Sequence, residues 1–444
     1  MNLRDKRALA VGMEASGKAA VRFLASQGAD VTASDLKPVE GLGVPFLLQT
    51  DDLFDQPFDL IVTSPGVPFD LPGLVRARAA GVKVIGDVEL AASYLQGHVI
   101  GITGTNGKTT TTSLTAHILR ESGVPVLLGG NIGRPVTDMI ADSRPGQWNV
   151  LELSSFQLET IETFRAHIAV GLNLTQNHLD RHHTLDAYAE AKSRLFRSQS
   201  KEDFAVLNLD DARCRAWGEV TPGTTVWFSA QAAGEPGWPG VWSIRGEHIW
   251  LDGKEFMPLA EIPIRGRHNA ENTMAASAAA HLAGVPLEVI PAAVRTFHAV
   301  EHRLEFVGRL SGVDFYNDSK ATSVDATLKA LDSFPGNLWV ILGGKDKGSD
   351  YHPLQAPLRA KAHSALLIGR AAPLIASHLD AAVPVIQAGT LDTAVREAYA
   401  RAHPGDTVLL APACASFDQF TGYEQRGRFF KEVVASLQEK QVWH

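Results

Sequence analysis

The stretch VIGITGTNGKTTTTSLTAHIL, residues 99–119, decides the fold of this chain. The apolar run at residues 99–102 predicts a buried strand and residues 109–119 predict a helix, so the segment between them is a turn. In such a turn small residues let backbone N–H groups approach an anion, the helix N-terminus supplies partial positive charge, and Lys108 supplies a full charge. The hydroxyl of Thr109 can bind Mg²⁺. The stretch therefore predicts a site for a nucleotide triphosphate.

The spacing of the glycines in this turn leaves an alternative open. A standard P-loop has four residues between its first glycine and its Gly-Lys pair. Here five residues separate Gly101 from Gly107. The alternative is a Gly-Thr turn that only caps a helix, with Lys108 solvated. The succession of strand, turn, GKTT and helix favours phosphate binding.

Length and composition bound the class of protein. At about 150 residues per domain, 444 residues predict two or three domains. A hydrophobic content of 45% with 20% charged residues is typical of a globular protein. Lys and Arg number 41 against 49 Asp and Glu, so the net charge is −8 and no global cationic field attracts nucleic acid or anionic membranes.

The termini and cysteines indicate the compartment. The N-terminus is charged and has only a short apolar run, so we expect no secretory signal. No apolar run is long enough for stable membrane insertion. Cys214 and Cys414 lack CxxC spacing, which is typical of buried thiols in a cytoplasmic protein.

Apolar strand-like runs alternate with Ala- and Leu-rich helical stretches, which predicts parallel α/β sheets covered on both faces. We expect three domains in series: a Rossmann-like domain at 1–88, a central P-loop ATPase-like domain at 89–296, and a second Rossmann-like domain at 297–444. The central domain is expected to have a mostly parallel sheet and a small β-rich part, with a hairpin around Asp252-Gly253. The expected strands are 7–11, 29–34, 60–63, 82–85, 99–102, 126–128, 150–153, 168–172, 205–207, 338–342, 365–368, 383–386 and 408–410.

The first turn, GMEASG at residues 12–17, is a degraded dinucleotide fingerprint. Asp35 ends the next strand at about the ribose-reading distance. A NAD-dependent dehydrogenase is the alternative here, but Glu14 stands where the pyrophosphate would approach most closely. We therefore expect a different, nucleotide-linked ligand.

Two polar clusters follow strands of the central region. Glu152 can bind Mg²⁺ together with triphosphate oxygens, or it can cap the next helix. The loop NLTQNHLDRH, beside the phosphate turn in a parallel sheet, is a candidate ligand loop rather than plain surface. Its polar residues are Asn173, His178, Asp180, His182 and His183.

Other candidates lie further along the chain. Lys192 stands among apolar neighbours, where a lysine usually extends its amine to solvent, and a reactive amine would require burial. In the third region Arg303, Lys320 and Lys347 are donors suited to phosphate or carboxylate, and Asp318 can hold a ribose hydroxyl. Neutral hydrogen-bonding partners there are Thr322, Ser416 and Gln419.

Taken together, several motifs resemble the Mur ligases, the ATP-dependent amide ligases of peptidoglycan precursor synthesis. The motifs are GTNGKTT, GGNIG, LELSSFQLE, NHLD, EAKSRLF, GRHNAEN, EHRLE, NDSKATS and PACASFDQF, and they run from about Val11 to Arg428 in the family order. SSFQLE, NDSKATS and ACASFDQF are most similar to the members that add D-glutamate to UDP-N-acetylmuramoyl-L-alanine.

The resemblance implies a reaction. ATP phosphorylates the carboxylate of the L-alanyl nucleotide sugar, and the amine of D-glutamate attacks the acyl phosphate to give an amide, ADP and phosphate. It also implies a role in cell wall growth, cell shape and division. The protein is expected to be a cytoplasmic monomer with these small-molecule substrates and no nucleic-acid partner.

The resemblance also implies site residues. ATP is expected at Gly104, Thr105, Asn106, Gly107, Lys108, Thr109, Thr110, Asn269, Asn272, Arg303 and Asp318. The uridine-linked substrate is expected at Ser16, Asp35, Lys37, Ser64, Gly66, Asn131, Ser154 and His178. D-glutamate is expected at Lys320, Thr322, Lys347, Ser416 and Tyr423. Two Mg²⁺ ions are expected, one at Thr109 and Glu152, the other at His178 and a CO₂-derived carbamate on Lys192. Catalysis is expected to involve Lys108, Glu152, His178 and Lys192.

Two rival functions remain open beside the dehydrogenase. A folylpolyglutamate-type ligase shares the phosphate loop and the activation chemistry. A nucleotide-binding regulator without an amide product is the rival from another class, although the polar cluster of the third region argues against it.

Overall fold

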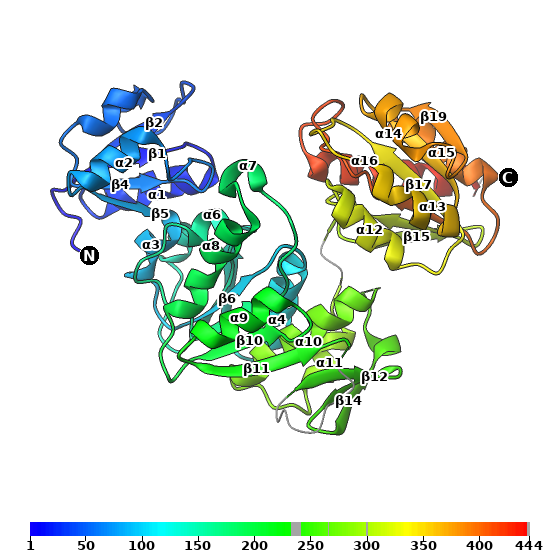
Figure 1. The fold of residues 1–444 in the computed structure, drawn as a ribbon, viewed down its shortest axis with the longest axis horizontal. Helices are drawn as coiled ribbons and strands as arrows, with labels where there is room; N and C mark the ends of the chain where they lie inside the picture. The colour runs from blue at the N-terminus through cyan, green and yellow to red at the C-terminus, as the bar shows by residue number, and fades with distance from the viewer. Residues whose placement is uncertain (232–240, 265, 299–300, 442–444) are drawn as a thin grey trace. The chain divides into compact units, whose positions relative to one another are not determined.

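The computed structural model describes residues 1–231, 241–264, 266–298 and 301–441 (Figure 1). The chain divides into two compact units. Unit 1 comprises Met1–Glu261 and Glu271–Thr296, and unit 2 comprises Ile262–Ala270 and Phe297–His444. Within the described ranges no helix combines the length and the apolar character needed to cross a membrane.

The first sheet of unit 1 is parallel throughout, in the order β3-β2-β1-β4-β5. Its strands are β1 (Arg7–Val11), β2 (Asp30–Asp35), β3 (Phe46–Leu48), β4 (Leu60–Thr63) and β5 (Lys83–Gly86). The helical elements are α1 (Ala15–Ser26), η1 (Asp51–Asp55), α2 (Pro72–Ala79) and α3 (Asp87–Ala92). Ala8 and Ala10 pack into one core and Leu9 and Val11 into another, so both faces are covered.

The second sheet of unit 1 has nine strands in the order β14-β13-β12-β11-β10-β9-β6-β8-β7. Neighbours from β7 to β12 pair in parallel, and β12, β13 and β14 pair antiparallel. The strands are β6 (His98–Thr103), β7 (Val126–Gly130), β8 (Trp148–Glu152), β9 (Ile168–Gly171), β10 (Phe204–Asn208), β11 (Thr224–Ser229), β12 (Trp242–Arg245), β13 (His248–Leu251) and β14 (Lys254–Pro258).

Helices flank this sheet on both sides (Figure 1). They are α4 (Lys108–Glu121), α5 (Val136–Met139), α6 (Ser155–Leu158), α7 (Leu179–His182), α8 (Leu185–Arg197), α9 (Ala212–Val220), η2 (Leu259–Glu261), α10 (Arg267–Leu282) and α11 (Ile290–Arg295). Helices α6, α8 and α9 pack on the face that carries Leu151, Leu153 and Leu207. Buried Glu89 accepts hydrogen bonds from the backbone of residues 162–164, which fixes the start of α3 against the second sheet.

The sheet of unit 2 has the order β15-β16-β20-β17-β18-β19, and only the β15–β16 pair is antiparallel among its described pairs. Its strands are β15 (Glu305–Leu310), β16 (Val313–Asn317), β17 (Leu338–Gly343), β18 (Ala362–Ile368), β19 (Val385–Gly389) and β20 (Thr407–Leu410). Its helical elements are α12 (Val324–Asp332), η3 (His352–Leu354), α13 (Gln355–Lys361), α14 (Ala372–Leu379), α15 (Leu391–Arg401) and α16 (Tyr423–Gln441). Helices α12 to α14 pack on one face, and α15 and α16 on the other (Figure 1).

The predicted alternation of strands and helices is confirmed as an α/β fold with several mostly parallel sheets. The hairpin is confirmed as well: Asp252 and Gly253 have φ of 51° and 74° between β13 and β14, as a two-residue turn requires. Cys214 and Cys414 are free and buried, as expected.

Three strands were not predicted. β3 has only 3 residues, and β15 is an edge strand that contains two charged residues, Glu305 and Arg309, and buries only Leu310. β16 is buried along its length although it contains Asp314 and Asn317. Because these two residues interrupt the apolar run, the sequence pattern did not indicate a buried strand there.

Candidate active site

The turn between β6 and α4 is held open by two glycines with positive φ. Gly104 has φ of 152° and Gly107, the N-cap of α4, has φ of 84°. A Cβ at Gly107 would overlap Oδ1 of Asn272, so the turn lies directly against α10. Asn173 clamps the turn from β9: its backbone oxygen accepts from Thr105 N and its side-chain oxygen from Asn106 N, both at 2.9 Å. The strand-turn-helix prediction is therefore confirmed.

Lys108 begins α4 and folds back over this turn. Its Nζ donates to the backbone oxygens of Gly104 at 3.0 Å and Thr105 at 2.9 Å. Thr109 and Thr110 are buried in the first turn of the helix. A full positive charge thus lies beside the N-terminus of a 14-residue helix, an arrangement that suits a phosphate group.

Glu152 ends β8 and is buried beside the first turn of α4. Its Oε2 accepts from Oγ1 of Thr109 at 2.8 Å, and its Oε1 accepts from Nδ2 of Asn131 at 2.9 Å. The following helix, α6, is capped by Ser154, whose Oγ accepts from Gln157 N at 3.2 Å. The capping alternative for Glu152 is therefore wrong. A carboxylate beside a hydroxyl is an oxygen donor set that fits Mg²⁺.

Lys192 lies in α8 with only 1% of its surface exposed, so it does not extend to solvent. Its Nζ donates to Oγ1 of Thr103 at 3.2 Å and to the backbone oxygen of Gly104 at 3.0 Å, and lies 4.8 Å from the ring centre of Tyr188. Burial, and then the charge of Lys108, lower the pKa of the Lys192 amine well below its usual range. Burial therefore favours the neutral, nucleophilic form of the amine.

Aromatic rings connect Lys192 with the His-rich loop. The rings of His178 and Phe156 lie 4.9 Å apart, and those of His178 and Tyr188 lie 6.1 Å apart. His182 is buried with Nε2 at 2.9 Å from Oγ of Ser155, whereas His183 is exposed. The side chain of Asp180 lies outside the described residues. Burial raises the pKa of Tyr188 to about 12, so its hydroxyl stays protonated near Oγ1 of Thr105, 3.3 Å away.

A cavity of about 480 Å³ opens in unit 1 where the order of the first sheet reverses between β1 and β4. Open α/β sheets bind ligands at such points. Ser16, Asp35, Ser64, Gly66 and Asn131 line it, so the structure brings together five of the residues expected at the uridine-linked substrate.

Three expected residues do not line this cavity. Lys37 is exposed, with its backbone N bonded to Oδ1 of Asp35 at 3.2 Å. Ser154 is engaged as a helix cap, and His178 lies with the aromatic group described above. Sequence reasoning missed Gln157, which lines the cavity and completes the capping box of α6. Its spacing after Ser154, S-x-x-Q, was the available signal.

In unit 2, the expected D-glutamate residues follow three neighbouring parallel strands. Lys320 and Thr322 follow β16, Ser416 and Tyr423 follow β20, and Lys347 follows β17. The carboxyl ends of parallel strands lie at one edge of the sheet, so these residues gather there. Nζ of Lys320 lies 5.5 Å from the ring centre of Tyr423, and Ser416 is buried.

Arg426 in α16 was missed and joins these loops. It is 1% exposed, and its guanidinium donates to Oγ of Ser319 at 3.0 Å, to the backbone oxygen of Ser319 at 2.8 Å and to that of Cys414 at 3.1 Å. A buried arginine in the first turn of a helix gives no sequence signal by itself, because arginine is usually a surface residue.

The residues expected at ATP are divided between the units. Asn272 lies against the phosphate turn in unit 1, where its Oδ1 accepts from Oγ1 of Thr111 at 3.2 Å. Asn269, Arg303 and Asp318 belong to unit 2. Asp318 is buried and accepts from Leu304 N at 3.3 Å; burial raises its pKa to about 6, although Arg303 and Lys320 oppose the shift.

We predict that Asp318→Asn stabilises the chain above pH 6. The folded carboxyl has a pKa of about 6 against 3.8 for the free group, so its contribution is favourable below pH 3.8 and is lost as pH rises through 6. Asparagine keeps the acceptor for Leu304 N without a buried charge. At about 1.4 kcal/mol per pKa unit, the gain at pH 7.5 should be about 3 kcal/mol and should vanish near pH 4.

Urea unfolding of both chains between pH 4 and 7.5 checks this prediction. Half-buried His268 has a pKa lowered to about 4 by desolvation, so its contribution to the stability of the chain is lost as pH falls through the same window. It is present in both chains, so the difference between them isolates Asp318. Asp380→Asn, at an exposed left-handed position, is the control and should change nothing. A difference that is the same at every pH would contradict the assignment.

Comparisons with known proteins give a consistent result. Residues 102–280 match the Mur ligase middle domain, and residues 302–414 match the Mur ligase glutamate ligase domain. A UDP-N-acetylmuramoylalanine–D-glutamate ligase of Solibacter usitatus is 61% identical over 99% of this chain and 100% of its own length. A ligase of the same name from Acidobacterium capsulatum is 48% identical over 100% of this chain and 99% of its own.

Solved structures share the fold. The UDP-N-acetylmuramate-alanine ligase of Thermotoga maritima aligns with a TM-score of 0.62 at 19% identity, covering 97% of this chain and 99% of its own. A pseudomurein peptide ligase of Methanothermus fervidus aligns with a TM-score of 0.60 at 19% identity, covering 98% of this chain and 100% of its own.

Proposed function

The chain belongs to the Mur ligase family, and from this premise we propose that it joins D-glutamate to UDP-N-acetylmuramoyl-L-alanine in peptidoglycan precursor synthesis. The reaction consumes ATP and yields an amide, ADP and phosphate. The observation that carries the proposal is the 61% identity, over the full length of both chains, to a ligase with that name. The same match disfavours the folylpolyglutamate, regulator and dehydrogenase alternatives.

The polar groups of unit 1 fit the first step, in which a carboxylate becomes an acyl phosphate. A carboxylate is a poor electrophile until one of its oxygens is phosphorylated and can then leave as phosphate. Lys108 and the N-terminus of α4 would bind the phosphates of ATP, and Glu152 with Thr109 would hold a Mg²⁺ ion. Bound Mg²⁺ neutralises charge on the transferring phosphoryl group. Asn131, which lines the cavity and donates to Glu152, positions the sugar-linked substrate beside this charge.

Lys192 is proposed to act as a carbamate. Its neutral amine can attack CO₂, forming an N–C bond and releasing a proton, and the product is a carboxylate-like anion. With His178 it would hold the second Mg²⁺. Tyr188 covers the amine and keeps water away from it.

The remaining assignments concern the other substrates. The 480 Å³ cavity would take the uridine diphosphate end, with Ser16, Asp35, Ser64 and Gly66 at its wall. Lys37, whose backbone N bonds Asp35, would add a positive charge to this end of the substrate. In unit 2 the cations Lys320 and Lys347 would pair with the D-glutamate carboxylates, helped by the expected hydroxyl donors Thr322, Ser416 and Tyr423. Asn269, Asn272, Arg303 and Asp318 would contact ATP.

We also propose the coarse organisation. The three sheets would correspond to three domains at 1–88, 89–296 and 297–444, the outer two Rossmann-like. ATP and the nucleotide sugar are cytoplasmic metabolites, so we place the reaction in the cytoplasm, carried out by a monomer.

One experiment tests the function. The chain is incubated with ATP, Mg²⁺, D-glutamate and UDP-N-acetylmuramoyl-L-alanine, and the product mass and the released phosphate are measured. We expect one D-glutamate per product and one phosphate per amide. Parallel reactions contain L-glutamate or a folate acceptor and should give no product. Turnover only with the folate, or ATP binding without phosphate release from any acceptor, would overturn the proposal.

A further inference from the structure

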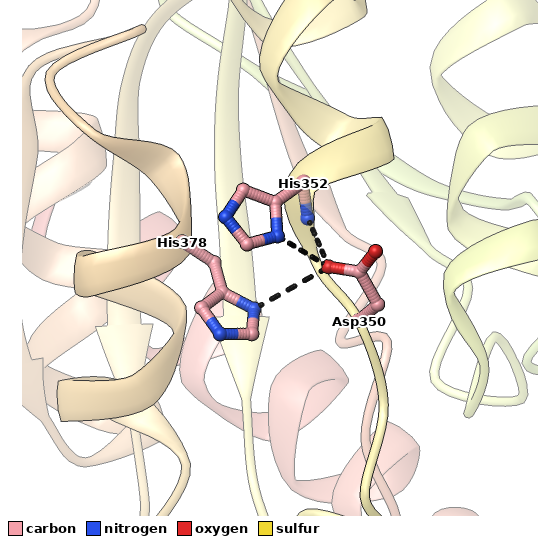
Figure 2. A group of neighbouring side chains, drawn as sticks. All are labelled: Asp350, His352 and His378. Carbon is pink, nitrogen blue, oxygen red and sulfur yellow. Dashed lines mark hydrogen bonds and ion pairs between the residues drawn. The ribbon is translucent and has the colours of Figure 1, made fainter.

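Three potential metal ligands meet on the surface of unit 2: Asp350, His352 and His378. Their ligand atoms all lie within 4.8 Å of one another. Oδ1 of Asp350 is 2.5 Å from Nδ1 of His352 and 3.6 Å from Nδ1 of His378. Figure 2 shows both imidazole rings turning a nitrogen toward the same carboxylate oxygen, one from η3 and one from α14. The three side chains therefore converge on one point.

The backbone around this point is anchored in the core. Tyr351, between two of the ligands, is fully buried, and its hydroxyl donates to Oδ1 of Asp346 at 2.7 Å. Nε2 of Gln355 donates to the backbone oxygen of His378 at 2.7 Å. Leu354 of η3 and Leu379 of α14 belong to the same hydrophobic core. Although the ligands reach the surface, the elements that carry them are fixed, so little ordering is required to bind an ion.

The electrostatics of the cluster favour a cation. The rings of His352 and His378 stack with centres 4.3 Å apart and planes at 23°, and two protonated rings at that distance would repel. Nδ1 of His378 accepts a hydrogen bond from Tyr351 N at 3.2 Å, so this nitrogen carries a lone pair and not a proton. The same nitrogen lies 3.6 Å from Oδ1 of Asp350. Nδ1 of His378 and Oδ1 of Asp350 both carry negative partial or full charge at 3.6 Å, so a positive ion that contacts both atoms is stabilised electrostatically.

We propose that Asp350, His352 and His378 form a binding site for a divalent transition-metal ion such as Zn²⁺. Two imidazole nitrogens and one carboxylate oxygen are its typical ligands, whereas Mg²⁺ prefers oxygen ligands alone. Zn²⁺ bonds of about 2.0–2.2 Å in a tetrahedron place ligand atoms about 3.3 Å apart, so the measured separations of 2.5 and 3.6 Å need adjustments below about 1 Å.

Binding has a defined proton balance. The ion replaces the hydrogen bond between His352 Nδ1 and Asp350 Oδ1: the neutral imidazole binds the ion through Nδ1 and keeps its single ring proton on Nε2, so no net proton is released. The ion also binds the Nδ1 lone pair of His378, which in the metal-free chain accepts the hydrogen bond from Tyr351 N. Water completes the coordination, because Asp350 and His352 have 67% and 58% of their side-chain surface exposed. The bound ion would join the loop after β17 to α14.

Metal binding to the full chain tests the proposal. The metal-free protein is titrated with Zn²⁺ in excess Mg²⁺, in competition with a chromophoric chelator, beside His352→Ala and Asp350→Asn. Asparagine at 350 keeps an acceptor for the backbone N–H of His352, so this variant should fold normally. We expect the wild-type chain to bind one more Zn²⁺ than either variant, or to bind it at least tenfold more tightly. His298→Ala, an exposed histidine of the same unit, is the control and should match the wild type.

Thermal unfolding gives the second readout. Zn²⁺ should raise the melting temperature of the wild type and of His298→Ala more than that of the two ligand variants, because only an intact site binds the folded chain preferentially. Without metal, all four chains should melt alike. Equal Zn²⁺ stoichiometry and affinity in the wild type and both ligand variants would overturn the proposal, whatever the ligase activity.

Discussion

Lys192→Ala should lower ligation by at least about 10³-fold, and a small carboxylic acid added at millimolar concentration should restore part of the rate. The amine is buried and held between Thr103, Gly104 and the Tyr188 ring, where its proposed carbamate supplies a negative group. Alanine leaves a cavity of about the size of the lost side chain, lined by the backbone of the phosphate turn. Formate or acetate can enter it and replace the missing anion.

The measurement is amide formation by Lys192→Ala with and without acetate. Lys201→Ala, which removes an exposed lysine soon after α8, is the matched control and should retain full activity. Intact mass spectrometry of the wild-type chain, with and without bicarbonate, should detect an added CO₂. Full activity of unrescued Lys192→Ala would refute the carbamate role, and a variant that is inactive with every added acid would confine Lys192 to a structural role.

Glu152→Gln should lower kcat/KM for ATP by about 10²- to 10³-fold and raise the Mg²⁺ concentration needed for half-maximal rate. Glutamine has nearly the same shape and can still bond Asn131 and Thr109, so the fold should be retained. What disappears is one buried negative charge beside the phosphate turn. A loss that excess Mg²⁺ partly corrects would therefore report metal binding rather than packing.

Glu121→Gln at the far end of α4 is the control for this variant. Its side chain is exposed, so the same chemical change there should leave both kcat/KM and the Mg²⁺ requirement unaltered. An unchanged Mg²⁺ requirement in Glu152→Gln would show that the carboxylate serves only to orient Thr109 and Asn131.

The phosphate turn could be predicted because its determinants are local. Strand, glycines, lysine and helix follow one another within residues 99–119, and each has its own propensity. The strand-end clusters could also be predicted, since parallel strands place their carboxyl ends at one edge. The uses of Glu152 and Lys192 could not be decided locally. Ser154, and not Glu152, caps α6, and the packing of α8 against the sheet buries Lys192; both facts depend on tertiary packing.

Contacts between segments that are distant in the sequence could not be predicted. Asn173 clamps a turn 67 residues earlier, and Arg426 bonds Ser319 across 107 residues. The cluster at Asp350 requires His378 from α14, 27 residues beyond Tyr351. No periodicity marks such pairs, because each partner is ordinary in its own segment.

The position of Arg426 has a genetic consequence. Its guanidinium lies behind the loops after β16 and β20, but its codon comes after those of all the described strands, in the segment that encodes α16. A nonsense codon just before this helix would spare every strand and every motif, and yet would remove the group that holds Ser319 and Cys414 together. Truncations just before α16 should therefore behave as null alleles, although every described strand is still encoded.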